Sequence, residues 1–180
     1  RMQDIAGCRA VVSTTSKAKK LEQKIVDSKT RNKLHSKKDY IKNPKETGYR
    51  GIHLIYKYDG TKQDYTNLFV EIQIRSKIQH SWATAVEVVD TFTNQALKSN
   101  QGQEDWKDFF RYASNEFSRL EKTPNLKTLE NEDTGKKLRE LLDKLQVINK
   151  LKAFSVTTRH IENNPANDNE YYLLILNTED

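Results

Sequence analysis

The sequence predicts an α+β protein with a mixed β-sheet flanked by helices. Three observations lead to this class. A compact β-branched segment at the start is followed by a helical one, and two later segments, 52–58 and 68–75, carry apolar residues at every second position. After residue 76 the apolar spacing changes to that of amphipathic helices. Strands that mostly precede the helices are typical of the α+β class.

The chain is expected to open with a strand and a helix. The strand is Cys8–Thr14, whose β-branched composition suits a buried strand. The helix follows over 16–28, with Ser16 as its expected N-cap. Its apolar face consists of Leu21, Ile25 and Val26.

A polar connection links this unit to the next strands. Residues 29–38 are compatible with a weak strand or with a loop. Residues 43–48 must form a loop, because Pro44 lacks a backbone donor and Gly48 permits a positive φ.

The alternating segments predict a hairpin. Its first strand is Ile52–Tyr58, and the pair Asp59 and Gly60 indicates a turn before the second strand, Leu68–Arg75. In the second strand the apolar face is Leu68, Val70, Ile72 and Ile74, and the polar face is Glu71, Gln73 and Arg75. The apolar face therefore belongs to the core, and the polar face meets solvent or carries chemistry.

Two amphipathic helices are then expected to cover the sheet. Their stripes are Ile78, Trp82, Ala85, Val89, Phe92 and Ala96 in the first, and Trp106, Phe109, Phe110, Ala113, Phe117 and Leu120 in the second. Pro124 ends the second helix. A third helix carries the stripe Leu138, Leu141, Leu142, Leu145, Ile148 and Leu151. Segments 153–160 and 170–177 predict a terminal hairpin across turn-forming residues.

Composition limits the function classes. The 180 residues suffice for one domain with its own core. The 31 Lys and Arg against 25 Asp and Glu give a formal charge of +6, which favours anionic partners such as nucleotides or RNA. The single cysteine, Cys8, excludes an intrachain disulfide and a zinc cluster, and it suggests a cytoplasmic setting. No apolar run approaches the roughly 18 residues of a membrane span, so no membrane partner is expected.

Three carboxylates are candidates for chemistry: Asp4 at the mouth of the first strand, Asp39 before the loop, and Glu71 on the polar face of the hairpin. A carboxylate at a strand end is most often solvated. Glu71 lies in a strand too apolar to be an edge, so it must face something polar, either Arg75 or a metal. Two carboxylates from different strands can hold Mg²⁺.

The bent loop carries cations that either are solvated or converge on a polyphosphate. They are Lys38, Lys42, Lys45 and Arg50. Tyr49 gains little from burial in a loop unless something stacks on its ring, and a purine base is the candidate. His53 suits a structural role and a ligand contact equally well.

Three segments taken together, "DIAGCRAVV", "KDYIKNPKETGYRGIHLIY" and "VEIQIRSKIQHSWATAVE", resemble the synthetase domain of the RelA/SpoT family, the GTP pyrophosphokinases. The resemblance covers about Gln3–Lys98. It implies a nucleotidyltransferase-like fold and a bacterial cytoplasmic enzyme of the stringent response. The implied reaction moves pyrophosphate from ATP to the 3′-hydroxyl of GDP or GTP, releases AMP and makes (p)ppGpp, with Mg²⁺ as cofactor.

The resemblance also implies residue roles. Asp4 corresponds to the Mg²⁺ aspartate, and Glu71 to the glutamate that holds metal or takes the proton from the 3′-hydroxyl. Tyr49 resembles the tyrosine that stacks on the acceptor guanine, and His53 lies close to the acceptor. The expected ligands of the acceptor phosphates are Lys38 and Lys45.

On the donor side, Arg9 and Gln73 resemble residues that line the cleft, and Lys17 resembles a cation near the ATP adenine. Thr47 and Gly51 stand where the family often has Asn and Ser, which leaves the choice of acceptor among GDP, GTP and tRNA open.

The family's basic ATP-binding segment precedes its "DIAG" motif, whereas only residues 1–3 precede it here. We therefore expect a fragment that binds guanine nucleotide but makes little product. The expected organisation is a synthetase core over 1–125, without its upstream ATP-binding segment, and a helix plus β-hairpin extension over 126–180.

Two alternatives remain open at this stage. The charge of +6 also suits a toxin of the same fold that pyrophosphorylates the 3′ end of tRNA. A catalytically silent nucleotide-binding module is the other, although the presence of Asp4 and Glu71 argues against it. A homo-oligomer is compatible with the sequence, which does not give the oligomeric state.

Overall fold

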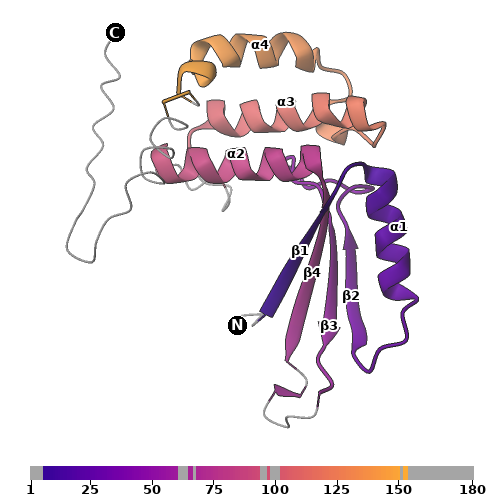
Figure 1. Cartoon of the computed structure of the whole chain (residues 1–180). Helices are drawn as coiled ribbons and strands as arrows, with labels where there is room; N and C mark the ends of the chain where they lie inside the picture. Colours follow the sequence, from indigo (N-terminus) through magenta and orange to yellow (C-terminus); the bar gives the residue numbers. More distant parts are fainter. Residues whose placement is uncertain are drawn as a thin grey trace, which may run out of the picture.

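The fold combines a four-stranded sheet with one helix on a face of the sheet and a stack of helices at its end (Figure 1). It is seen in a computed structural model of the chain, which describes residues 6–60, 65, 66, 68–93, 97, 102–150, 152 and 153. The predicted α+β class with a mixed sheet and flanking helices is confirmed.

The sheet has the strand order β1-β4-β3-β2. Its strands are β1 (Ala6–Val12), β2 (Lys33–Asp39), β3 (Ile52–Lys57) and β4 (Phe69–Ser76). β1 runs parallel to β4, and the other two pairings are antiparallel. The predicted hairpin is therefore confirmed as β3 and β4, and the polar stretch that suited a strand or a loop forms β2.

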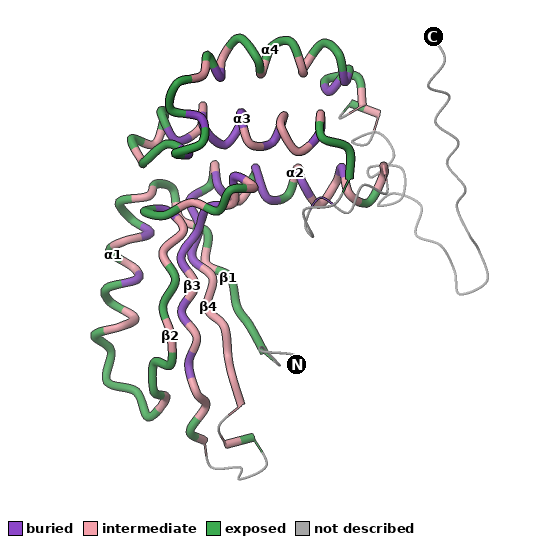
Figure 2. The backbone as a smooth tube through the Cα atoms, turned by 180° about the vertical axis from the view of Figure 1, so that it is seen from behind, coloured by how far each residue is buried: buried purple, intermediate pink, exposed green. Residues whose placement is uncertain are grey.

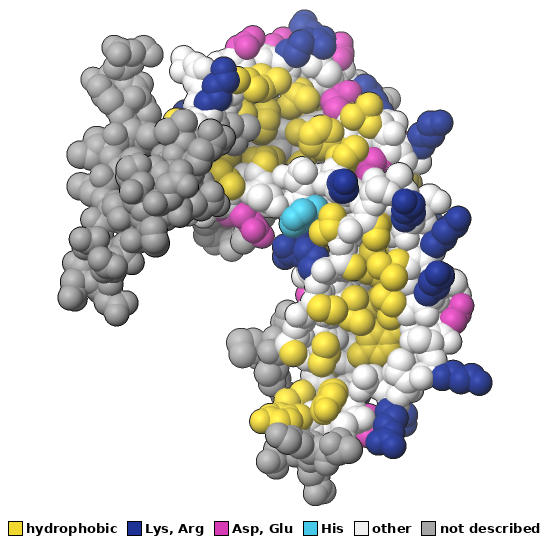
Figure 3. Space-filling view, in the orientation of Figure 1, with side chains coloured by type: hydrophobic (Ala, Val, Ile, Leu, Met, Phe, Trp, Pro, Cys, Tyr) yellow, Lys and Arg dark blue, Asp and Glu magenta, His cyan; other side chains and the backbone are white. Residues whose placement is uncertain are grey.

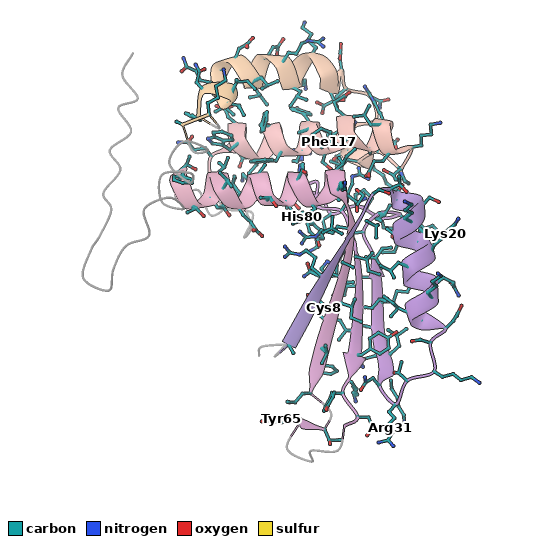
Figure 4. The ribbon with its side chains drawn as sticks, viewed as in Figure 1. Cys8, Lys20, Arg31, Tyr65, His80 and Phe117 are labelled. Carbon is teal, nitrogen blue, oxygen red and sulfur yellow. The ribbon has the colours of Figure 1, made fainter. Side chains whose placement is uncertain are left out.

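The prediction of a buried first strand is wrong. β1 lies at the edge of the sheet and most of its residues are exposed, as Figure 2 shows along its length. Cys8, labelled on β1 in Figure 4, is exposed and carries a free thiol. An edge strand has a neighbour on one side only, and β-branched composition does not distinguish this position from a central one.

α1 (Thr15–Val26) packs on one face of the sheet. Its N-cap is Thr14 rather than Ser16, because the Thr14 hydroxyl accepts a hydrogen bond from the backbone N–H of Lys17 at 3.2 Å. Under the helix lies a core of Ala18, Ile41, Ile52, Leu54, Tyr56 and Ile74, against which the predicted stripe Leu21, Ile25 and Val26 packs. This face of the sheet is therefore the apolar face that the alternating pattern predicts.

The other helices stack at the end of the sheet instead of covering it, which corrects the prediction (Figure 1). They are α2 (Lys77–Thr93), α3 (Glu104–Glu121) and α4 (Thr134–Lys144), with a 3₁₀ turn, η3 (Lys127–Leu129), before α4. α2 begins directly after the last residue of β4, so it carries the chain past the end of the sheet. Their shared core includes Trp82, Val89, Trp106, Phe110, Leu145 and Val147.

Some predicted helical positions differ from the structure. Leu120 is 72% exposed, and α4 ends before Gln146, whose positive φ of 48° interrupts the third stripe. Ala96, Leu151 and, apart from Ala153, the expected terminal hairpin lie outside the described residues. Within the described part of the chain, no helix has the length and apolarity needed to cross a membrane.

Candidate functional site

A row of polar residues crosses the face of the sheet that α1 leaves open. Arg9 on β1 pairs with Gln73 on β4, Gln73 pairs with His53 on β3, and His53 pairs with Lys38 on β2. Paired residues in a ladder point to the same face, so these four predicted site residues form one line across the sheet. Glu71 lies two positions before Gln73 and shares that face.

Five side chains on this face and the adjoining loop form a closed ring of hydrogen bonds. His53 contacts Glu71 through Nδ1 and Oε1 at 2.6 Å, and Tyr49 through Nε2 and the phenol oxygen at 2.5 Å. Gln73 Nε2 donates to the other Glu71 oxygen at 2.7 Å. Arg75 closes the ring, donating to Gln73 Oε1 at 2.9 Å and to the Tyr49 hydroxyl at 3.2 Å.

The protonation states follow from this arrangement. Burial lowers the pKa of His53 below its ordinary value, more than the neighbouring Glu71 carboxylate raises it, so the imidazole is neutral at pH 7. Burial also raises the pKa of Tyr49, which keeps the phenol protonated. Hence the neutral ring donates from Nδ1 to Glu71, and its Nε2 accepts from the Tyr49 hydroxyl.

The expectation of Arg75 as the direct ion-pair partner of Glu71 is wrong. The Glu71 oxygens contact His53 and Gln73, whereas the Arg75 guanidinium bonds to Gln73 and Tyr49. Gln73 lies between the two charged residues on β4, so its amide bridges them. Arg75 is 5% exposed and carries the compensating positive charge through this bridge.

The loop before β3 is shaped by Asp39, the third candidate carboxylate. Its Oδ1 accepts the backbone N–H groups of Ile41 and Lys42 at 3.1 and 3.0 Å, and Oδ2 accepts from the Lys19 ammonium. Burial raises the pKa of Asp39, but these hydrogen bonds outweigh it and hold the pKa below its ordinary value. Asp39 therefore has a structural role at the start of the loop.

Arg50 and Gly48 fasten the loop to α3. Arg50 Nε donates to Ser114 Oγ at 3.0 Å and Nη1 to the Pro124 carbonyl at 2.7 Å, while Ser114 Oγ donates to the Gly48 carbonyl at 2.6 Å. Gly48 has a φ of 91°, and a Cβ there would lie 2.9 Å from the Ser114 Cβ. Arg50 is 4% exposed, so the prediction that it joins the loop lysines on a polyphosphate is wrong.

The other predicted loop cations are exposed. The Lys45 ammonium lies 4.8 Å from the ring centre of Tyr40 and 5.2 Å from that of Tyr49. Lys38 belongs to the row across the sheet, and Lys42 extends from the turn made by Asp39. Figure 3 shows Lys and Arg side chains at the inner corner where the helices meet the sheet.

A cavity of about 350 Å³ opens at this corner. From the sheet and loop it is lined by Arg9, Lys45, Thr47, Tyr49, Gln73 and Arg75, and from the helices and the segment after α2 by Trp82, Ala83, Val86, Glu87, Leu97, Lys107, Phe110 and Arg111. Five lining residues are cations and one is an acid, so the cavity is suited to an anion.

Sequence reasoning missed the helical wall of this cavity. Lys107, Phe110 and Arg111 follow the i, i+3, i+4 spacing of one helical face. That spacing is visible in the sequence, but the apolar stripe through Phe110 predicts core positions, and Lys107 and Arg111 beside it are typical of solvent-exposed residues.

Several predicted residues do not line the cavity. Lys38, His53 and Glu71 lie on the open face of the sheet but are not among the lining residues. Lys17 lies in the first turn of α1, on the helix that covers the opposite face of the sheet, and Asp4 lies outside the described residues. Among the residues that the structure describes, no group of three or more His, Cys, Asp or Glu could hold a metal. Glu71 is the predicted metal ligand that the structure does place.

Comparisons with known proteins match the chain to one group. A family model described as the region found in RelA/SpoT proteins matches residues 1–91. The GTP pyrophosphokinase YjbM of Bacillus subtilis is 34% identical over 84 residues, which are 46% of this chain and 39% of that protein.

Solved structures give the same picture. Small alarmone synthetase 1 of Bacillus subtilis, bound to its product pppGpp, is 29% identical with a TM-score of 0.58, covering 67% of this chain and 60% of that one. Small alarmone synthetase 2 of the same species is 25% identical with a TM-score of 0.58, covering 68% and 65%. The chain thus spans less than two thirds of the length of these relatives.

Proposed function

Because this chain belongs to the RelA/SpoT family, we propose that it transfers the pyrophosphoryl group of ATP to the 3′-hydroxyl of GDP or GTP and makes (p)ppGpp. The observation that carries the proposal is the hydrogen-bonded ring from Tyr49 to Glu71 beside a cationic cavity. Pyrophosphoryl transfer depends on positioning and on neutralising charge, and this arrangement supplies both.

On the acceptor side, the Tyr49 ring is the proposed platform for guanine. The Tyr49 ring packs in T-shaped arrangements with Trp82 and His53, and the buried Arg75 guanidinium lies 5.2 Å from its centre. The exposed Lys45 ammonium also lies over the ring, so an incoming purine displaces it from there and leaves it free to bind a phosphate. Lys38 is the second proposed acceptor phosphate ligand.

Glu71 is the proposed acceptor of the proton from the 3′-hydroxyl. Its side chain is 14% exposed, and Oε1 is fixed by His53 while Oε2 is fixed by Gln73. A carboxylate held from both sides keeps its orientation while one lone pair on each oxygen remains available. His53 and Tyr49 thus link the base-stacking ring to the proton acceptor.

The carboxylate oxygens proposed here would also suit a divalent cation as ligands. Mg²⁺ prefers oxygen ligands and often takes only one or two protein carboxylates along with substrate phosphates. Glu71 offers free lone pairs, and Asp4 is the proposed second ligand. When bound, Mg²⁺ would neutralise charge on the polyphosphate.

For the donor side we propose Arg9 and Gln73 as contacts of ATP, with Lys17 as a further cation near the adenine. Arg9 is exposed at the rim of the cavity, next to Gln73 across the ladder. A cytoplasmic location follows from these substrates and is part of the proposal.

The test is a transfer assay with ATP labelled at the β-phosphate. The protein is incubated with Mg²⁺ and GDP, GTP or a tRNA ending in CCA, and the products are separated by thin-layer chromatography. We expect label on the 3′ position of the guanine nucleotide and release of AMP. Label on tRNA alone would identify the tRNA-modifying alternative. Guanine nucleotide binding with little or no transfer is also expected of a fragment without the ATP-binding segment; adding the family's basic ATP-binding segment ahead of residue 1 should then give transfer, whereas a silent binding module would stay inactive.

A further inference from the structure

The helical wall of the cavity carries two cations that none of the site motifs includes. Lys107 and Arg111 belong to α3, beyond the residues 1–91 that match the family model. We propose that they bind the 5′-phosphates of the acceptor nucleotide and thereby make the protein bind GTP and GDP more tightly than GMP. This inference rests on the proposed function, because it assumes a guanine nucleotide on Tyr49.

The burial of these cations is the first argument. The side chain of Lys107 is 19% exposed and that of Arg111 is 28% exposed, although lysine and arginine side chains are mostly solvated. Phe110, between them in sequence, is 4% exposed and contributes to the same wall. Partial desolvation beside an aromatic wall strengthens the attraction between a cation and an anion that enters the cavity.

The charge arrangement on α3 is the second argument. Lys107 and Arg111 are four residues apart, a spacing at which like charges destabilise a helix. Each is offset by an acid one turn earlier: Lys107 by Glu104 at 2.5 Å and Arg111 by Asp108 at 2.8 Å. Glu104 is 79% exposed and Asp108 is 36% exposed, so these pairs are weak and can yield to a phosphate with several charged oxygens.

Arg111 is also oriented toward the acceptor loop. Its Nη2 donates to Thr128 Oγ1 at 3.3 Å, and Thr128 Oγ1 donates to Glu46 Oε2 at 3.1 Å. The guanidinium has five N–H donors, and the two bonds to Asp108 and Thr128 leave donors for a further ligand. The Arg111 guanidinium, held by Asp108 and Thr128, is therefore preorganised to bind phosphate oxygens.

The geometry of the ribose assigns these cations to the acceptor rather than to the donor. The acceptor must present its 3′-hydroxyl to Glu71, which does not line the cavity itself but accepts a hydrogen bond from Gln73 of the cavity lining. The 5′-phosphate leaves the ribose on the side away from the 3′-hydroxyl, and therefore extends toward the wall made by α2 and α3. Lys45 and Thr47 of the acceptor loop line the same cavity, which keeps the acceptor next to this wall.

The experiment compares affinities for guanosine, GMP, GDP, GTP and a non-hydrolysable ATP analogue by calorimetry. The variants are Lys107→Gln, Arg111→Gln and the double variant, with Lys136→Gln on the exposed side of α4 as a matched control. Lys107→Met keeps the length and the apolar contacts of the stem while removing the charge, and Arg111→Lys keeps the charge. Thermal melts monitor folding of each variant.

We expect each glutamine substitution to weaken GTP binding about tenfold and the double variant about a hundredfold, on the scale of one charged hydrogen bond each. The affinities for guanosine and the ATP analogue should be unchanged, and among the guanine nucleotides GMP should lose the least affinity. Lys107→Met should weaken GTP binding as much as Lys107→Gln does. Arg111→Lys should retain part of the GTP affinity.

An equal loss of affinity for guanosine and GTP would show that these residues only pack the cavity wall. A loss of affinity confined to the ATP analogue would place them at the donor nucleotide. Unchanged GTP affinity in the double variant, with intact wild-type turnover, would overturn this inference alone. A wild-type protein that neither binds nor converts guanine nucleotides would instead overturn the proposed function.

Discussion

The two walls of the cavity differ in how the chain builds them. The sheet wall consists of polar lining residues from adjacent strands and from the loop before β3, together with His53 and Glu71, which do not line the cavity but complete the closed ring of hydrogen bonds. The helical wall consists of an aromatic core, represented by Trp82 and Phe110, with cations at its margin. Strand alternation fixes the first wall locally, whereas the second depends on how α2 and α3 pack against the end of the sheet. The sheet wall is therefore suited to chemistry and the helical wall to shaping and selection.

The sharpest test of this difference is Glu71→Gln on the sheet wall. The amide has almost the same shape and can still accept from Gln73, but it cannot take up a proton or offer a negative charge to a cation. We expect turnover to fall on the order of 10²-fold or more, with the fold intact.

The comparison variant is Glu87→Gln, which changes the acid of the helical wall. Its expected loss of turnover is less than about tenfold, because this residue lines the cavity but is not one of the five residues of the hydrogen-bonded ring. Equal losses from the two substitutions would contradict the division of labour between the walls. Near wild-type rates for Glu71→Gln would remove Glu71 from the mechanism.

Tyr49 links the two walls, because its hydroxyl belongs to the closed ring of hydrogen bonds while its aromatic side chain packs against Trp82 in a T-shaped arrangement. Tyr49→Ala should weaken guanine nucleotide binding by roughly 1–3 kcal/mol, the scale of one base-aromatic stack. Tyr49→Phe should keep most of the affinity but lower turnover, since His53 Nε2 loses its donor. Calorimetry with steady-state kinetics separates the two effects, and an equal loss of affinity in both variants would reject stacking.

The sequence predicted the sheet wall well for a physical reason. Alternation across 52–58 and 68–75 determines which face His53, Glu71 and Gln73 share, and ladder pairing then brings them together. The motifs that resemble the RelA/SpoT family overlap these segments, so the roles proposed for His53, Glu71 and Gln73 fall on one face of one sheet.

The helical side of the molecule could not be predicted in the same way. Periodicity shows that a helix has an apolar stripe, but not which element covers that stripe. The stripes through Trp82 and Phe110 therefore suggested a cover for the sheet, while in the structure they pack on each other at 5.9 Å between ring centres. Arg50 was misassigned for the same reason, because its partner Ser114 is 64 residues away in sequence.

Arg50 joins the two walls, so Arg50→Met tests how far one depends on the other. The substitution keeps much of the volume but removes the bonds to Ser114 and Pro124. Burial lowers the pKa of Arg50 to about 10, which still leaves it charged at neutral pH. We expect a loss of about 1–2 kcal/mol in the free energy of unfolding and a higher KM for the guanine nucleotide, with the KM for ATP nearly unchanged.

Ser114→Ala is the matched variant, because it removes the donor to the Gly48 carbonyl from the side of α3. It should raise the same KM by a smaller factor. A lower stability without any change in the acceptor KM would show that this anchor serves folding only.

The smallest expected effect concerns pH and the neutral state of His53. Burial lowers its pKa in the folded protein below the ordinary value of 6.5. Above pH 6.5 neither the folded nor the unfolded state holds the proton, and the full stability is present. As the pH falls from 6.5 toward the lower pKa of the folded state, His53 becomes protonated in the unfolded chain but stays neutral in the folded protein, so the free energy of unfolding decreases. Below the folded pKa the imidazole is protonated in both states, and the free energy of unfolding decreases no further on this account.

Urea unfolding of the wild type and of His53→Gln between pH 5 and 8 measures this contribution, because the remaining titrating groups are common to both proteins. The difference between their free energies of unfolding should change only below pH 6.5. Turnover should also fall below pH 6.5. A protonated His53 donates from both nitrogens, so Nε2 can no longer accept the hydrogen bond from the Tyr49 hydroxyl. A pH-independent difference would mean that His53 takes up its proton equally in both states, and it would contradict the lowered pKa of the buried imidazole.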